Sequence, residues 1–513
     1  MKKFLARLGS MTKGAPGAVL IAVLCSGLVI LFSLSPAHDR LEYVLYDLRC
    51  KLKAKPEPLH ELVLLNVDEA SVTALGVYPW PRHYYAYAMR QMQEVGLANL
   101  VFDFQFIDDS PPLLNPDGFN LLYSALAEGQ EIAPDDLFSV IIDNDKDLAM
   151  ATEEFPGTIM PFSFAKVENK HSLSQDELAV KLEAIARFTS KASLPLPAGK
   201  EERFRALADA DRVTINYPIP SLMNAAEHFG FVDNDADLDG VHRKVRLARV
   251  FGNRIYLHLS LVAFLRMCGV GIDSLDIEPG KSIIIREAVN PATGRRGDIT
   301  IPVDSSCAMY FDWIGNFDQT ARSVPAHALI EYANLASQFE MQLMLKDMTS
   351  GRSDRQELAL QLDELKAAIL AESDLEKRFI LRSEYRDVLV RYDAIIASYL
   401  VGIRAELDQA LALKTSGYDV GNDNIQSLQD LIIAINTKTK VDSLFDSVAV
   451  MGLTATGTQD EGVTPLSSDL LDGGIVPHRH KHPCKGALHQ AGSSFLGVCR
   501  HGRLGSWLDP VHS

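Results

Sequence analysis

The stretch LVLLNVDEASVTALGVYPWPRHYYAYAMRQMQEVGLANLVFDFQF, residues 62–106, decides the fold. It begins and ends with short apolar runs, 62–68 and 97–106, which are typical of buried strands. A helical pattern lies between them and stops at Gly96. A strand, a helix and a second strand in this order favour two parallel strands joined by a crossover helix.

The same alternation continues further along the chain. TIMPFSFA, 158–165, is a third expected strand, and SVAVMGLTAT, 447–456, is the last one. Shorter strands are expected at 230–232, at 243–250 and within 282–304. The sequence therefore predicts an α/β fold with a mostly parallel mixed sheet and flanking helices.

The stretch GVYPWPRHYY, 76–85, lies between the first strand and the first long helix. Its two prolines fix the backbone direction, which favours a structural corner over an active-site loop. We expect Trp80 to close the sheet edge and Arg82 to reach a carboxylate at a strand end. Contact of Arg82 with a ligand is the alternative.

Acidic residues follow the first two strands, where open α/β sheets place their ligands. These are Asp68 and Glu69 after the first strand and Asp103 in the second. Such carboxylates can act as acids or bases in an enzyme. The favoured alternative is structural: Asp68 caps the next helical turn and Asp103 pairs with Arg82. The sequence contains no GxSxG, GxGxxG or Walker motif.

The acidic loop DNDADLDG, 233–240, resembles the start of a calcium-binding EF-hand. That motif requires a carboxylate at its twelfth position, where this chain has Arg246. An acidic turn is favoured, and a looser cation site is the alternative. The six cysteines form no CxxC pair. No metal site, cofactor or catalytic residue is predicted, in spite of the HRHKH run at 478–482.

The N-terminus carries a membrane signal. Four basic residues and no acid precede an uncharged segment at 14–37, which is long enough to cross a bilayer. We expect residues 1–13 in the cytoplasm, a transmembrane helix at 14–37 and the rest of the chain outside the inner membrane. A cleaved signal peptide, cut near Ser35–Ala37, is the alternative. The net charge of −17 in 513 residues argues against a nucleic-acid partner.

A long helical stretch is expected at 331–440. Apolar residues recur there at intervals of four and three, which predicts helices with one apolar face. The recurring residues are Leu358, Leu362, Leu365, Ile369, Leu381, Tyr385, Val388, Tyr392, Ile395 and Tyr399. This face packs on its own domain or forms a dimer arm, and the sequence alone leaves both alternatives open.

The composition changes abruptly at 479–513. Six of the fourteen histidines lie between 478 and 513, and from 479 onward basic residues outnumber acidic ones five to one. We interpret this tail as atypical, with the composition expected of a shifted reading frame.

Several runs, in this order, resemble the type-two CHASE sensory domain of bacterial membrane receptors. They are the stretch quoted first, PIPSLMNAAEHFGFVDNDADLDGVHRKVRL, YLHLSLVAF, IPVDSSCAMYFDWIG and AVMGLTATGTQDEGVTPLSS. The resemblance implies a sensor domain over 38–478, in which 331–440 is an insertion. The family-like positions include the candidate ligand-binding or structural residues Asp68, Glu69, Trp80, Arg82, Asp103, Asp239 and Arg243.

The resemblance also implies a function. The domain would sense a small-molecule or envelope signal outside the cell and regulate a cytoplasmic effector, such as a class III adenylate cyclase or a histidine kinase. We expect that this chain lacks the effector and is not itself an enzyme. We expect a membrane-bound homodimer. The alternatives are an extracytoplasmic hydrolase that uses Asp68 and Asp103, and an envelope interaction protein built on the helical stretch.

Overall fold

The chain divides into two compact units, of which the N-terminal one contains two helices and the larger one contains all the strands described below. The computed structural model describes residues 15–53, 61–76, 78–130, 133, 140–166, 175–208, 214–237, 239–310, 322–350, 354–418 and 420–453. The atypical tail and the HRHKH run lie outside the described residues.

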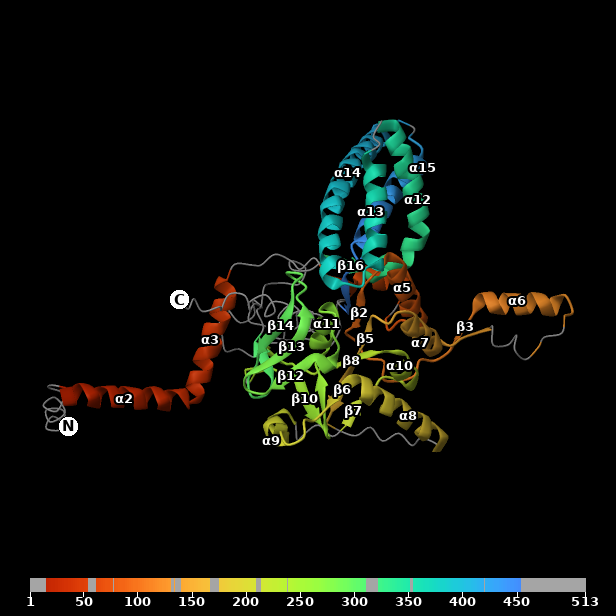
Figure 1. The fold of residues 1–513 in the computed structure, drawn as a ribbon. Helices are drawn as coiled ribbons and strands as arrows, with labels where there is room; N and C mark the ends of the chain where they lie inside the picture. The colour runs from red at the N-terminus through yellow and green to blue at the C-terminus, as the bar shows by residue number, and fades with distance from the viewer. Residues whose placement is uncertain are drawn as a thin grey trace. The chain divides into compact units, whose positions relative to one another are not determined.

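A mostly parallel sheet forms the centre of the larger unit (Figure 1). Within the described residues its strand order is β16-β1-β17-β2-β5-β7, and β8 also pairs with β5. Only the pairing of β5 with β7 is antiparallel. The bounds are β1 Leu62–Val67, β2 Asn99–Phe102, β5 Thr158–Ala165, β7 Thr214–Asn216, β8 His228–Phe231, β16 Arg322–Pro325 and β17 Val448–Leu453. The expected fold class is confirmed.

The last described strand, β17, lies between β1 and β2. Leu62 pairs with Val448 on one side of it, and Asn99 pairs with Val448 on the other. The expected crossover therefore exists, but its two strands are not neighbours. The sequence predicted an apolar strand at 447–456 and gave no sign that it lies at the centre of the sheet.

Helices cover the sheet, and every residue of β1 is buried. Val63, Leu65 and Val67 contact one apolar cluster, whereas Leu62 and Leu64 are buried outside it. This alternation places apolar side chains on both faces of the sheet. Helix α11 packs on β8, β5 and β2. Helix α7 contacts both α5 and α10, and α10 also contacts α8. The bounds are α4 Glu69–Leu75, α5 Arg82–Val95, α7 Asn144–Glu154, α8 Gln175–Ala192, α10 Pro220–Ala225 and α11 Leu259–Met267.

Smaller sheets extend the larger unit. They consist of an antiparallel meander, a three-stranded sheet and a two-stranded pair. Their strands are β12 Leu275–Glu278, β13 Ser282–Val289, β14 Arg296–Pro302, β6 Ser193–Pro195, β10 Ala248–Phe251, β11 Arg254–Leu257, β9 Lys244–Arg246 and β15 Ala308–Tyr310. The short hairpin of β3 Leu113–Leu114 and β4 Ile141–Ile142 leads to α6, Pro116–Ala127.

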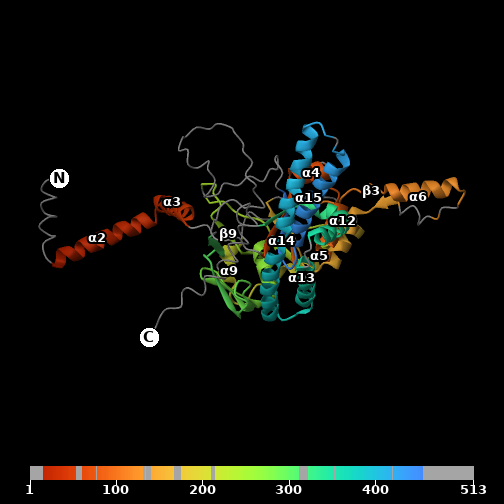
Figure 2. The same ribbon diagram turned by 90° about the horizontal axis from the view of Figure 1, so that it is seen from above.

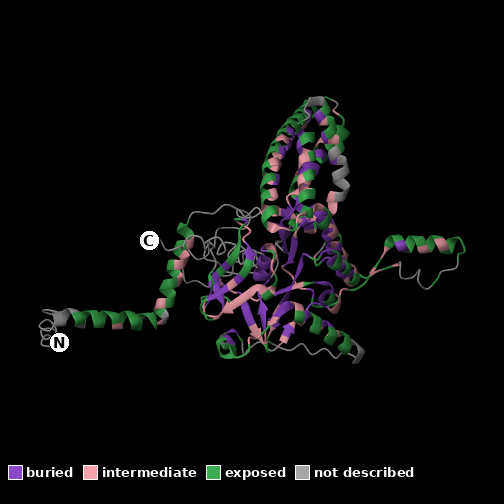
Figure 3. Cartoon of the chain, viewed as in Figure 1, coloured by how far each residue is buried: buried purple, intermediate pink, exposed green. Residues whose placement is uncertain are grey.

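Four helices form an arm that stands on the sheet unit (Figures 1 and 2). They are α12 Ala326–Ser350, α13 Asp354–Ala371, α14 Leu375–Thr415 and α15 Asn422–Asp442. Their buried apolar cluster includes Leu358, Leu362, Ile369, Tyr385, Tyr392 and Tyr399, which belong to the predicted stripe. In Figure 3, buried and exposed residues are interspersed along the arm's helices. In the described residues the stripe therefore packs on its own domain.

The N-terminal unit contains α2, Ala15–Ser33, and α3, Pro36–Leu52. A single membrane-crossing helix at 14–37 was expected, but the helix ends at Ser33. Ser35 is extended, and Pro36 begins a new helix because its ring suits the first helical turn. Among the described residues no single helix is long and apolar enough to cross a membrane. Ile21–Ser33 and Ala37–Leu52, bent by 77°, meet that requirement only together, by length and composition.

Packing of the central strand is testable at Met451. We expect Met451→Ala to lower the free energy of unfolding by about 2–5 kcal/mol, because the side chain is 1 % exposed and its removal leaves a cavity. Met341→Ala on α12 is the matched control. Its side chain is 62 % exposed, so a change of about 0.5 kcal/mol or less is expected. Urea unfolding followed by circular dichroism measures both, and equal losses would contradict the central position of β17.

Candidate functional site

The strand-end acids have mainly structural surroundings. Asp68 is the N-cap of α4, and its Oδ1 accepts a hydrogen bond of 2.8 Å from the Ser71 backbone N–H. The predicted capping role is therefore confirmed. Glu69 is exposed in the first turn of the same helix. Asp103 follows β2 and donates its backbone N–H to Met451 O over 2.9 Å. Because β17 separates β1 from β2, the backbones at Asp68 and Asp103 are two strand spacings, about 9–10 Å, apart across the sheet, and the register offsets them by two further residues along the strands.

The corner at 76–85 is built as a structural element. Trp80 is 5 % exposed, and its Nε1–H donates to Gly76 O over 2.9 Å. Arg82 begins α5 and pairs with Asp145 and with the backbone carbonyl of Asp108. Its guanidinium carbon also lies 5.2 Å from the centre of the Phe106 ring.

The expected pairing of Arg82 with Asp103 is wrong. Its carboxylate partner, Asp145, lies at the start of α7, and that helix packs on α5. The packing of α5 on α7 brings the charged residues at the starts of the two helices together. The sequence does not show in advance which helices will pack. The arginine therefore holds α5 to α7.

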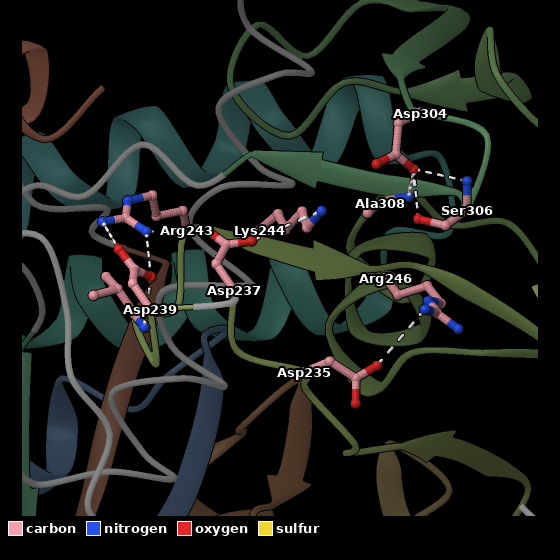
Figure 4. A network of polar contacts seen from close by, with 10 residues as sticks. Asp235, Asp237, Asp239, Arg243, Lys244, Arg246, Asp304, Ser306 and Ala308 are labelled. Carbon is pink, nitrogen blue, oxygen red and sulfur yellow. Dashed lines mark hydrogen bonds and ion pairs between the residues drawn. The ribbon is translucent and has the colours of Figure 1, made fainter. Parts of the chain in front are cut away.

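The acidic loop forms a network with Arg243, which directly precedes β9, and with arginines of β9 and β10 (Figure 4). Arg243 holds Asp239 with two hydrogen bonds of 2.9 and 2.8 Å and reaches Asp237 at 3.3 Å. Arg249 pairs with Asp235 at 2.5 Å. The side chains of Arg243 and Asp237 are each only 2 % exposed. The structure therefore brings the predicted residues Asp239 and Arg243 together as an ion pair, in which the Arg243 side chain is buried and that of Asp239 is 41 % exposed.

This network acts as a scaffold. Burial opposes the charged form of Asp239, but hydrogen bonds from Arg243 and from the Val241 backbone outweigh it and lower the pKa of that carboxyl. The described residues contain no group of three His, Cys, Asp or Glu side chains that could hold a metal ion. The acidic turn is thus stabilised by the chain's own arginines.

A different place, the base of the helical arm, has the geometry of a binding site. A cavity of about 400 Å³ lies there, and a neighbouring one of about 330 Å³ shares part of its lining. The residues common to both cavities are Arg322, Tyr385, Leu389, Asp393, Asp442 and Ser443. Arg322 comes from the first residue of β16 and the others from α14, α15 and the segment after α15. The cavity therefore lies where the arm meets the amino ends of the parallel strands.

Several groups in this cavity have shifted pKa values. Burial, followed by the nearby Asp442 carboxylate, raises the pKa of Asp393, and Arg322 acts in the opposite direction. Burial also lowers the pKa of Arg322. The pKa of Tyr385 is raised, mainly by burial and then by the two acids. Perturbed titratable groups in a cavity are typical of functional sites.

Packing around Gly96 supports one wall of the cavity. Gly96 ends α5 with a φ of 87°, and a Cβ there would lie 2.9 Å from the Phe445 ring. The Phe445 ring in turn lies 4.9 Å from that of Tyr385, between ring centres. A glycine at the helix end thus makes room for the aromatic wall.

The sequence analysis missed this site. Tyr385 was predicted only as part of an apolar stripe, and neither Asp393 nor Arg322 was predicted as a site residue. The one available signal was that Asp393 directly follows the stripe residue Tyr392. An acid beside the apolar face of a helix lies at the edge of a packed interface.

The Arg243 network leads to a prediction on stability. We expect Arg243→Gln to lower the free energy of unfolding at neutral pH by about 3–5 kcal/mol, because the buried carboxylate of Asp237 loses its closer cationic partner and keeps only Lys244, at 3.8 Å. Arg286→Gln is the matched control. Arg286 also pairs with two acids, Asp276 and Asp298, but its side chain is 49 % exposed, so a loss of about 0–1 kcal/mol is expected.

The pH dependence follows from Asp239. Its pKa in the folded chain lies below the ordinary value of 3.8, so its stabilising contribution is present above pH 3.8 and is lost as the pH falls further. The difference between wild type and Arg243→Gln should therefore narrow under these acidic conditions. Thermal unfolding across this pH range checks both expectations. A difference that stays constant with pH would contradict the ion-pair assignment.

Comparison with known proteins identifies a family for this chain. A family model of the CHASE2 domain matches residues 19–491, which is most of the chain. No curated protein and no solved structure gives a significant match. CHASE2 domains are extracellular sensory domains and are not themselves catalytic. The chain belongs to the CHASE2 domain family.

Proposed function

We propose that this chain is the extracytoplasmic signal-sensing module of a bacterial transmembrane receptor. The observation that carries the proposal is the family match over residues 19–491. The module regulates a cytoplasmic effector, such as a class III adenylate cyclase or a histidine kinase. Sequencing the gene beyond codon 465 and translating every frame tests this link. An open frame that encodes membrane helices and a catalytic domain supports it, and the lack of one in every frame contradicts it.

The proposed location is the inner membrane, with a single crossing and most of the chain outside. The uncharged segment 14–37 and the four basic residues that precede it support this orientation. The bent pair of α2 and α3 has the length and composition required for a crossing. The large unit that contains the sheet and the arm then lies on the outer side.

The proposed mechanism is a shift between two packings of the arm against the sheet. The cavity is lined by residues of both parts, so a bound signal contacts the arm and the strand ends together. A ligand that fits one packing better shifts the population toward it by its difference in affinity.

We also propose that the module acts as a homodimer. A dimer has one membrane-crossing segment from each protomer, and a movement of one segment relative to the other can transmit a signal. Mass photometry of the full chain in detergent tests this. Twice the chain mass of 56.5 kDa is expected, and a single chain mass would contradict the dimer.

We favour the sensory proposal over the hydrolase alternative. Asp68 is engaged as a helix cap, and a whole strand separates it from Asp103. The envelope-interaction alternative was built on the helical arm. Residues of the predicted stripe pack in the arm's own apolar cluster, and we favour the sensory proposal, which the family match supports.

The outward orientation is testable by cysteine labelling. In a background without native cysteines, Ala394→Cys places a thiol at an exposed position of α14. A membrane-impermeant maleimide should label it in intact spheroplasts. The matched control, Lys3→Cys, precedes the uncharged segment and should react only after lysis. The opposite pattern of labelling would contradict the proposed orientation.

A further inference from the structure

The cavity at the base of the arm contains two opposite, half-buried charges that the chain leaves uncompensated. Among the described residues, the half-buried carboxylate of Asp393 on α14 accepts no hydrogen bond and forms no ion pair. Lys366 on α13 likewise forms no ion pair with any described residue, and its Nζ lies 5.7 Å from the centre of the Phe445 ring. Asp393 and Lys366 line the same cavity but do not pair with each other.

Several neighbouring charges at the base of the arm are compensated within the chain. Lys438 pairs with Asp442 at 2.5 Å, and Tyr332 also donates to Asp442 over 3.2 Å. Similar pairs join the arm to the sheet. Arg386 pairs with Glu61 at 2.6 Å, and Arg378 and Arg382 both pair with Asp446. These partners are therefore engaged, while Asp393 and Lys366 are available to a ligand.

Leaving a half-buried charge without a partner costs free energy, because water solvates it only in part. Arg322 acts on Asp393 through space without forming an ion pair with it, while Asp442 repels it. A positively charged ligand group would pair with Asp393 and offset this repulsion. A negatively charged ligand group would pair with Lys366.

We infer that the cavity binds a zwitterionic small molecule of about amino-acid size, whose ammonium group pairs with Asp393 and whose acidic group pairs with Lys366. The inference rests on the proposed sensory function and specifies its ligand class. The volume of about 400 Å³ lies in the usual range of small-molecule sites. Tyr385, Leu389 and Tyr392 supply apolar walls for the part of the ligand between its charges.

The experiment uses the full chain in detergent and measures its thermal unfolding midpoint. The probes are the protein amino acids and γ-aminobutyrate, which vary the distance between the two charges, each tested separately. A ligand that binds only the folded state raises the midpoint. At least one zwitterion should do so. Its N-acetyl derivative and its methyl ester should not, because each lacks one of the two charges.

Four variants locate the site. Asp393→Asn and Lys366→Met should each weaken the binding of that zwitterion by about tenfold or more, since each removes one charged partner. Asp408→Asn and Lys377→Met are matched controls at exposed positions of α14 outside the cavity lining, and they should bind like the wild type. The midpoints without ligand report whether each variant folds.

Three results would overturn the inference. They are the absence of a shift with every zwitterion, an equal shift with the ester or the N-acetyl derivative, and unchanged binding in Asp393→Asn and Lys366→Met. The outcome is separable from that of the proposed function. If Ala394→Cys is labelled from outside and no zwitterion binds, the ligand class is wrong and the sensor orientation stands. Labelling only after lysis would reject the orientation whatever the binding result.

Discussion

The insertion of β17 between β1 and β2 is the constraint on which the rest of the structure depends. A buried backbone needs partners for its N–H and C=O groups, and the central strands obtain theirs from a segment more than 340 residues after β2. Until Val448–Leu453 is in place, β1 and β2 have no partner on their facing edges. The same insertion separates Asp68 from Asp103, and it anchors the end of α15 at the amino edge of the sheet.

Local features were predictable because neighbouring residues determine them. The strand at 158–165, the helix end at Gly96 and the cap at Asp68 all follow from short patterns of apolar and polar residues. The order of strands and the partner of Arg82 were not predictable, since both depend on which distant elements pack together. The cavity was missed for the same reason. Its lining comes from β16, the arm and the segment before β17, which meet only in the folded chain.

Two groups of charged residues in this domain illustrate how similar side chains serve different purposes. Around Arg243, the buried guanidinium meets two carboxylates within 3.3 Å, so the charges stabilise the loop and leave nothing for a ligand. At the base of the arm, most charges are also paired, but Asp393 and Lys366 are not paired with any described residue. A scaffold gains stability from full compensation, whereas a binding site must keep some charge uncompensated. This criterion supports the second group as the proposed binding site, although the first contains more residues singled out by sequence.

The position of the cavity also explains how its occupancy can affect the whole unit. Helix α12 begins directly after β16, packs on α4 and α5, and contributes Phe339 to the apolar cluster of the arm. Helix α15 returns from the arm and leads through Phe445 and Ser447 into β17, the strand next to β1. A change in arm packing therefore acts on the sheet through both chain connections, β16 before α12 and β17 after α15. Because β1 is also the first strand after the N-terminal helices, the cavity is connected along the chain to the segment that would carry a signal to the membrane.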